Sequence, residues 1–560
     1  MGMILGLCST LTTSSQTTTP LLPPEAGERV VLQCERSLYG VSETLHYTAA
    51  CQKPAQIGDL GWSSVLYVEL IRWDGTQLAG SKAAIIDGHA IGNLQIPETV
   101  LSGNYYLRAY TRWMRNYSPY RYAYLPLKVM NPASPLIDQG PESGAVSDGV
   151  RFYKNTRNLE SVVLEGLQEN YGTRQPVELN FSLSDPGDAG SYSLAVARQR
   201  ADDIDAGQFW IASPGSEKEA TEIQYFPEID GLSLTGKVVN RATGAAVPGM
   251  KVNLSSYSGS FHFASSMSDE EGKFAFVLPS YQGNHEFHVA KENGSEEKYQ
   301  ILIGNEFCRQ EVELPYVPFE LEENEKALAS EIMFNARLGQ RYLSPDVSAA
   351  GRTNGYQGFY GVAGTVYHSK DYIELDDLEE FFFEVIHEVL VGRIKQVPYL
   401  MVTGTSSLVG YPPLILMDNI PVTDIGNLLE AGMYRIDRVE VVNKGYVVGD
   451  YRYNGVISIF SANRDMAGIA LTGDSRFFSY QLFSESESDF PDYSGSLKDS
   501  PVADRRNLLY WEPQLKLTEG AGSGIHFYTS DAPGSYVVLL RRLQPDGSTL
   551  FFKTASFTVK

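Results

Sequence analysis

The hydrophobic residues of this chain fall in short runs that alternate with polar residues and end at glycine- and proline-containing turns. A period of two is typical of β-strands that bury one face, and runs this short favour antiparallel sandwiches. Clear examples are residues 29–34, 65–70, 177–182 and 534–541. The pattern therefore predicts a mainly β protein with several domains.

The pattern changes between residues 371 and 470. Residues 374–391 begin with Asp376 and Asp377, which suit the positive end of a helix, and continue with one helical stripe made of Leu375, Leu378, Phe382, Val385, Ile386 and Val389. Short β-branched runs follow at residues 412–422, 436–443 and 454–459, with a second predicted helix after the first run. This alternation predicts an α/β domain.

In order and wording, those three runs resemble the plug domain of TonB-dependent outer-membrane receptors. The resemblance implies a plug-like domain over residues 371–470. A receptor of that class closes a barrel of about 22 strands of roughly 10 residues each, whereas 100 residues follow Phe460. We therefore expect a plug-like domain without its barrel, and a protein that is not itself a transporter.

Other stretches resemble β modules. Residues 27–132, with the wording VLYVEL and SGNYYLRAYTRWMRN, resemble the second macroglobulin-like domain of alpha-macroglobulins in bacterial envelope proteins. Residues 232–316 resemble the carboxypeptidase-regulatory-like domain, a transthyretin-like sandwich. Further sandwiches are predicted at residues 140–228 and 500–560, and a helix with a Gly/Tyr-rich linker at 319–365. The predicted fold is mainly β and multidomain, with Ig- or macroglobulin-like sandwiches, a transthyretin-like sandwich and the α/β plug-like domain.

Residues 1–19 have the composition of a signal segment that lacks its basic start, which a start codon assigned too far downstream would explain. Cys8 is a candidate lipid anchor, although the preceding Leu7 is large for that motif; the alternative is simple cleavage near Gln16. No other segment approaches the roughly 18 apolar residues that span a bilayer. We expect an exported protein of the cell envelope, periplasmic or outer-membrane associated, without a transmembrane span of its own.

The net charge of −23 argues against nucleic acid and anionic bilayers as partners of so acidic a body. Among the four cysteines, Cys34 and Cys51 flank a predicted hairpin and could form a disulfide in an oxidising envelope. Buried free thiols are the alternative. Cys308 would then be unpaired.

Catalytic motifs are absent from the sequence. His285 and His288 lack the spacing of a zinc carboxypeptidase, and no HExxH or GxSxG motif occurs. The Cys-x-x-Gln thioester of macroglobulins is also missing, since Cys34 is followed three residues later by Ser37. We expect no metal, no cofactor and no enzymatic activity. A hydrolase hidden in an unrecognised carboxylate cleft stays open as a weaker alternative.

Two aromatic stretches are candidate partner surfaces. The first comprises Tyr110, Arg112, Trp113, Arg115 and Tyr117, and the second Tyr446, Tyr451 and Tyr453. Such residues could stack on glycans or contact a protein. For the first stretch, the favoured interpretation is that half of its tyrosines pack inward along alternating strands and the rest line a rim. The expected function is a non-catalytic scaffold that binds a protein or glycan partner as an accessory to an outer-membrane assembly. The main alternative is a plug-like subunit that acts in trans in a TonB-dependent uptake system.

Overall fold

The computed structural model describes most of the chain between residues 27 and 560. The described ranges are 27–53, 61–141, 151–153, 156–198, 210–212, 223–256, 263–278, 280–291, 298–321, 325–326, 328–331, 334, 360, 363–372, 375–404, 410–448, 451–469, 475–484, 490–495, 497–543 and 550–560. The predicted signal segment with Cys8 and most of the predicted linker at 319–365 lie outside these ranges. The described residues form β-strands in several sheets and only short helices, so the predicted mainly β fold is confirmed.

The N-terminal sandwich is built from eight strands in the order β1-β3-β6-β5-β4-β7-β8-β2. Their bounds are β1 Arg29–Cys34, β2 Leu38–Gly40, β3 Thr44–Gln52, β4 Val65–Ile71, β5 Gln77–Ile86, β6 His89–Gln95, β7 Gly103–Thr111 and β8 Ala123–Met130. The tyrosines of these strands fill the interior, because aromatic side chains bury a large apolar area on a pleated surface. Tyr39, Tyr47, Tyr67, Tyr110 and Tyr124 are fully buried.

A second sandwich joins two parts of the chain that the sequence predicts to be separate domains. One sheet has the order β10-β35-β34-β14-β32, with β12 also on β35, and the other has the order β11-β13-β33. We call this the composite sandwich; its strands are β10 Thr156–Asn158, β11 Val162–Glu165, β12 Asn170–Tyr171, β13 Pro176–Leu183, β14 Gly190–Arg198, β32 Leu508–Leu517, β33 Ser523–Tyr528, β34 Gly534–Arg542 and β35 Leu550–Val559. Each segment supplies strands with an apolar face, and alternation does not identify the partner of that face.

The composite sandwich therefore corrects the prediction of two sandwiches at residues 140–228 and 500–560. Strand β14 lies between β32 and β34 and pairs with both. Each of the two described sheets contains strands from both segments. Outside these sheets, a small ladder joins β9 Arg151–Tyr153 and β15 Trp210–Ala212.

The central sandwich contains the sheets β19-β16-β21 and β18-β17-β20-β31. Strand β31 returns from beyond the following α/β domain and adds to the edge of β20. The strands are β16 Leu232–Asn240, β17 Lys251–Ser256, β18 Phe263–Met267, β19 Lys273–Leu278, β20 Asn284–Lys291, β21 Tyr299–Ile303 and β31 Arg476–Gln481. Its core is continuous with that of the N-terminal sandwich, since Leu254 and Phe287 belong to the same apolar cluster as Leu66 and Tyr110.

The α/β head comprises the described residues between 360 and 469. Its sheet has the order β22-β27-β30-β25-β26, and two hairpins pair β23 with β24 and β28 with β29. The elements are β22 Thr365–His368, α2 Leu378–Glu384, β23 Val389–Ile394, β24 Val397–Val402, β25 Leu414–Met417, β26 Ile420–Pro421, α3 Ile425–Leu429, β27 Ile436–Val442, β28 Tyr446–Val448, β29 Tyr451–Tyr453 and β30 Val456–Ser461.

Local chemistry explains these element ends. Asp377 caps α2 by accepting a hydrogen bond from the Glu380 backbone N–H. Asp418 and Asn419 both have positive φ, as the tight β25–β26 turn requires. The helix predicted over residues 374–391 is shorter than expected: it ends at Glu384, and Val389 begins β23. The Val-Leu-Val run there suits a strand paired with β24 better than a helical stripe.

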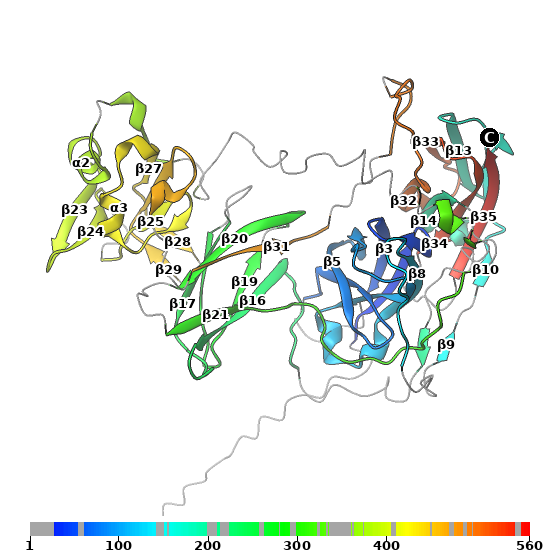
Figure 1. The fold of residues 1–560 in the computed structure, drawn as a ribbon, viewed down its shortest axis with the longest axis horizontal. Coiled ribbons are helices and arrows are strands. Elements are labelled where there is room, and N and C mark those ends of the chain that lie inside the picture. Colours follow the sequence, from blue (N-terminus) through cyan, green and yellow to red (C-terminus); the bar gives the residue numbers. More distant parts are fainter. Residues whose placement is uncertain are drawn as a thin grey trace, which may run out of the picture.

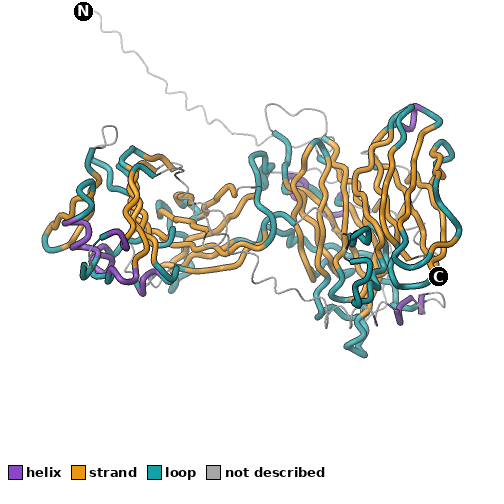
Figure 2. The backbone as a smooth tube through the Cα atoms, turned by 90° about the horizontal axis from the view of Figure 1, so that it is seen from above, coloured by secondary structure: helices purple, strands orange, loops and turns teal. Residues whose placement is uncertain are grey.

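The four units follow one another along the long axis of the molecule (Figure 1). The α/β head lies at one end, followed by the central, N-terminal and composite sandwiches. Figure 2 shows the same elongated arrangement from above. Along the chain, however, the central sandwich and the head are inserted between β14 and β32 of the composite sandwich.

Candidate functional site

The first predicted partner surface lies inside the protein. Tyr110 is fully buried and stacks between Tyr67, at 5.7 Å between ring centroids, and Tyr122, at 4.7 Å. Its hydroxyl accepts a hydrogen bond of 2.6 Å from the Cys308 backbone N–H, and burial raises its pKa well above the usual value. Trp113 and Tyr117 are buried as well. These three residues do not form the candidate partner surface; their burial agrees with the favoured interpretation that the aromatic residues of this stretch pack inward.

The two arginines of that surface contact other segments of the same chain. Arg115 donates a 2.9 Å hydrogen bond to the backbone carbonyl of Glu306 and lies 4.0 Å from the ring centroid of Tyr225. Arg112 lies 3.7 Å from the Glu306 carboxylate and 4.0 Å from that of Glu228. These contacts join the N-terminal sandwich to the segments that precede and follow the central sandwich. The contacts of both arginines are therefore made within this chain.

Buried charges at this junction were missed in the sequence. Arg108 and Glu69 form a fully buried ion pair with 2.7 Å between Nη2 and Oε2. Glu228 accepts hydrogen bonds from the Tyr67 hydroxyl and the Ser233 backbone N–H, and burial raises the pKa of its carboxyl. The sequence does contain a signal for these buried charges, namely a charged residue within an otherwise apolar strand, as in the VLYVELI run of β4. The arrangement fixes two sandwiches against each other.

The second predicted surface is also an internal interface. The β28–β29 hairpin that carries Tyr446, Tyr451 and Tyr453 packs against the central sandwich, in a cluster with Phe263. The Lys251 ammonium from β17 lies 3.9 Å from the ring centroid of Tyr451 and 4.8 Å from that of Tyr453. Such cation–π contacts are strongest where water is excluded. These tyrosines hold the α/β head on the central sandwich.

The predicted disulfide does not form. Cys34 lies opposite Tyr47, and Cys51 lies opposite Val30, at the other end of the β1–β3 ladder. Four residues along a strand span about 13 Å, whereas a disulfide needs its Cα atoms within about 7 Å. Cys34, Cys51 and Cys308 are free thiols, and burial raises the pKa of Cys34 to about 12. Free thiols, which were the alternative to a disulfide, are therefore what the structure shows, and they are buried or partly buried.

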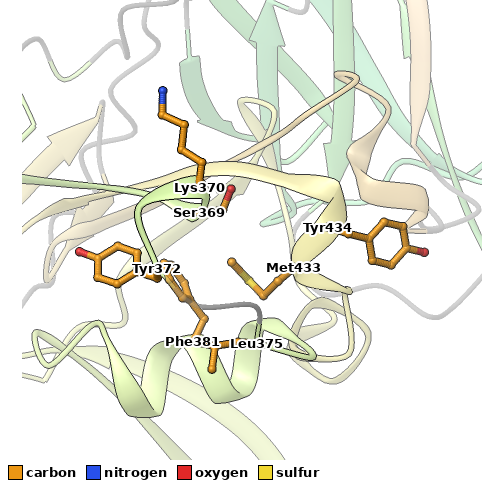
Figure 3. Close-up of a pocket in the computed structure, with 7 residues that line it drawn as sticks. All are labelled: Ser369, Lys370, Tyr372, Leu375, Phe381, Met433 and Tyr434. Atoms are coloured by element: carbon orange, nitrogen blue, oxygen red, sulfur yellow. The ribbon is translucent and has the colours of Figure 1, made fainter.

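A cavity of about 330 Å³ opens beside α2 in the α/β head (Figure 3). Its lining consists of Ser369, Lys370, Tyr372, Leu375, Phe381, Met433 and Tyr434. Figure 3 shows Leu375, Phe381 and Met433 grouped at the centre, with Tyr372 and Tyr434 on opposite sides. None of these residues stands out in the sequence as a site residue. Their separation in the chain hides the site, because α2 and the turn before β27 meet only in the folded head.

The polar groups of this cavity are few. The Ser369 hydroxyl already donates a 2.6 Å hydrogen bond to the Ile436 carbonyl. The Tyr372 ring packs edge-on against Phe381, with 5.6 Å between centroids. Tyr434 is 76% exposed and accepts a 2.9 Å hydrogen bond from Arg435 Nε. An apolar floor between two phenol groups is suited to binding an apolar side chain.

The histidines of β20 occupy ordinary strand positions. His288 is buried against the Phe477 ring, with 4.8 Å between centroids, and burial lowers its pKa to about 4. His285 Nε2 lies 3.0 Å from the Gln282 carbonyl. Within the described ranges, no group of three or more His, Cys, Asp or Glu side chains could hold a metal ion. No described helix is long and apolar enough to cross a bilayer.

No protein-family model matches the sequence, and a search of curated proteins gives no match. Among solved structures, the native alpha-2-macroglobulin of Escherichia coli is similar with a TM-score of 0.23 and 9% identity over 96% of this chain and 40% of that chain. Salmonella alpha-2-macroglobulin reacted with methylamine is similar with a TM-score of 0.23 and 11% identity, over 97% of this chain and 40% of that chain. A tetra-tandem repeat from a large adhesion protein is similar with a TM-score of 0.13 and 9% identity, over 95% of this chain and 99% of that chain. The chain thus spans about two fifths of the length of these macroglobulins, and TM-scores this low transfer neither family nor function.

Proposed function

We propose that this protein is a non-catalytic binding scaffold of the Gram-negative cell envelope, and that its α/β head contacts another envelope protein as an accessory to an outer-membrane assembly. The motif order at residues 412–459, which resembles receptor plug domains, supports an outer-membrane context for the head. The macroglobulin-type and carboxypeptidase-regulatory-like wording of the sandwiches supports an exported scaffold. In this proposal the three sandwiches position the head and carry out no chemistry.

The distribution of exposed apolar side chains carries the proposal. Among the described residues, 24 large hydrophobic side chains are exposed, and ten of them belong to the head, which makes up about a fifth of the chain. Clustered apolar exposure marks interaction surfaces, whereas scattered residues need no explanation. The candidate aromatic residues of the N-terminal sandwich, Tyr110, Trp113 and Tyr117, are buried in contrast. Binding is therefore assigned to the head.

The cavity beside α2 favours a protein partner over a glycan. A sugar ring needs several hydrogen-bond donors and acceptors, whereas the floor here is formed by Leu375, Phe381 and Met433. A leucine or aromatic side chain of a partner would fill such a floor, and Tyr372 and Tyr434 would contact its backbone or edges.

The test is capture from solubilised native envelope with the purified full chain as bait. Tyr434→Ala should reduce the recovery of a specific partner at least fivefold, because it removes the most exposed ring of the cavity. Tyr411→Ala is the matched control, since Tyr411 is an exposed tyrosine of the head that does not line the cavity. Equal recovery with both variants would contradict the assignment of the cavity as the binding site.

The same experiment separates the alternatives. Capture of an outer-membrane barrel protein would favour a plug-like subunit that acts in trans, for which the motif order at residues 412–459 is the supporting observation. A signal on a glycan array without protein capture would replace the protein partner by a sugar. Turnover of any substrate by the purified chain would end the non-catalytic proposal.

A further inference from the structure

The β23–β24 hairpin of the α/β head has two apolar faces. Its inner face packs into the core of the head through Val389, Leu400 and Val402. On the outer face the register pairs Leu390 with Met401 and Ile394 with Val397. A single β-hairpin that serves only the core would alternate apolar and polar residues. The outer face is therefore unexplained by the fold.

Apolar exposure on this face increases toward the turn. Leu390 and Met401 are 49% and 44% exposed, whereas Ile394 and Val397 next to the turn are 64% and 66% exposed. Between the two pairs the Tyr399 ring covers Gly392, where an added Cβ would lie 2.4 Å from the ring carbon Cζ. The strip of apolar side chains is thus continuous from the base of the hairpin to its tip.

The tip is built to protrude. Lys395 and Gln396 have φ values of 50° and 70°, which form the tight two-residue turn that matches strand twist. In both views of the molecule the hairpin lies at the outer end of the long axis, away from the sandwiches (Figures 1 and 2). An apolar surface that is most exposed at a protruding turn differs from the flat or concave patch with a polar rim that is common at protein interfaces.

The charges of the hairpin have one sign. The 29 residues from Val389 to Met417 include Arg393 and Lys395 but no aspartate or glutamate, in a chain whose net charge is −23. Arg393 forms an ion pair with Glu379 of α2 at 2.6 Å, and both side chains of this pair are accessible to solvent. Lys395 is exposed within the turn itself. Basic residues beside exposed aliphatic ones complement an anionic lipid surface.

We propose that the tip of the β23–β24 hairpin inserts Ile394 and Val397 into the headgroup layer of an anionic bilayer, with Lys395 and Arg393 at the lipid phosphates. The acidity of the chain does not prevent this, because Glu379 of α2 is paired with Arg393 and charges more than a Debye length of about 8–10 Å from the tip are largely screened at physiological ionic strength. This inference goes beyond the proposed function and uses another surface than the cavity beside α2. Four of the ten exposed apolar residues counted for the head belong to this hairpin. The two proposals can still fail independently, because the capture and vesicle experiments substitute different residues.

The test uses the full chain, purified without lipid modification, and sedimentation with large unilamellar vesicles. One set contains phosphatidylethanolamine and phosphatidylglycerol, and the other contains phosphatidylcholine alone. Wild-type protein should bind the anionic vesicles at least fivefold more tightly than the zwitterionic ones, and added salt should weaken binding. Ile394→Ser with Val397→Ser should reduce binding to anionic vesicles at least fivefold, and Lys395→Gln about twofold.

Ile86→Ser is the matched control, because Ile86 is a 69% exposed aliphatic residue that ends β5 beside a tight turn of the N-terminal sandwich. It should leave vesicle binding unchanged. Circular dichroism melts of all variants establish that each is folded. Absence of wild-type binding to anionic vesicles, equal binding to both vesicle types, or binding that survives the double serine substitution would each overturn the proposal.

Discussion

Glu69 and Arg108 lie side by side inside the N-terminal sandwich, and neither side chain reaches solvent. Burial raises the pKa of Glu69, and the adjacent guanidinium opposes that effect. Arg108 also donates a hydrogen bond to the Cys308 carbonyl at 3.2 Å, which ties the segment after the central sandwich to β7. At the residue scale, such charges fix the orientation of packed units, because an unpaired buried charge is costly.

Glu69→Ala should lower the free energy of unfolding of the N-terminal sandwich by about 3–5 kcal/mol, because it leaves the Arg108 charge buried without its partner. Urea denaturation followed by tryptophan fluorescence measures this change. Replacing both residues by leucine should recover most of the loss. The matched control is Glu379→Ala, whose partner Arg393 is exposed, and its cost should stay below about 1 kcal/mol. A cost for Glu69→Ala no larger than this control would refute the interpretation.

At the element scale, β31 illustrates how a distant strand completes a sheet. It pairs with β20 from Asn284 opposite Gln481 to Val289 opposite Arg476, which places Phe477 beside the buried His288. The Lys82 ammonium of the N-terminal sandwich then holds the end of β31, with 3.0 Å to the Gln481 carbonyl and 3.8 Å to the centroid of the Tyr480 ring. The strand returning from the head is therefore anchored to two sandwiches.

The burial of His288 predicts a pH dependence of stability. Its pKa falls to about 4 in the folded protein from an ordinary value of 6.5, so the folded state binds the proton less well than the unfolded state. The stability linked to His288 is complete above pH 6.5 and is lost as the pH falls toward 4, by up to about 3 kcal/mol. Comparing urea denaturation of wild type and His288→Leu across this range isolates the effect from other groups. Parallel pH profiles of the two proteins would contradict it.

At the scale of the whole molecule, the chain leaves the composite sandwich after β14 and returns to it at β32. Arg198 at the end of β14 donates its backbone N–H to the Asn507 carbonyl at 2.9 Å, so the two ends of the insertion are adjacent. The composite sandwich also contacts the N-terminal sandwich, since Gln33 donates to the Arg542 carbonyl at 3.0 Å and accepts from Ser193. The insertion thus leaves and re-enters the fold at one place.

A chain that joins residues 151–198 to 507–560 through an Asn-Gly turn should fold by itself, because the turn closes a β14–β32 hairpin that already exists. Residues 140–228 alone should not fold, because β14 would lose the neighbours on both of its sides. Thermal melts by circular dichroism should give a cooperative transition for the first chain and none for the second. A cooperative transition for residues 140–228 alone would restore the domain boundaries predicted from the sequence.

The mainly β class and the apolar face of each strand were determined by the sequence, because alternation with a period of two directly encodes burial on one side. The turn at Asp418 and Asn419 was equally readable, since few other residue types accept positive φ. The end of α2 could not be predicted from the sequence, because Val389 continues the helical stripe but pairs with Val402 in the fold. Local patterns specify what is buried and where the chain turns.

Only the tertiary structure decided which buried faces meet. Tyr110 and Tyr453 were candidate surface aromatics in the sequence, yet each packs against a segment far away along the chain, at Cys308 and Lys251 respectively. The cavity beside α2 likewise combines Phe381 with Met433. Pairing between distant segments depends on the complementarity of whole surfaces, and one strand's pattern contains no information about its partner.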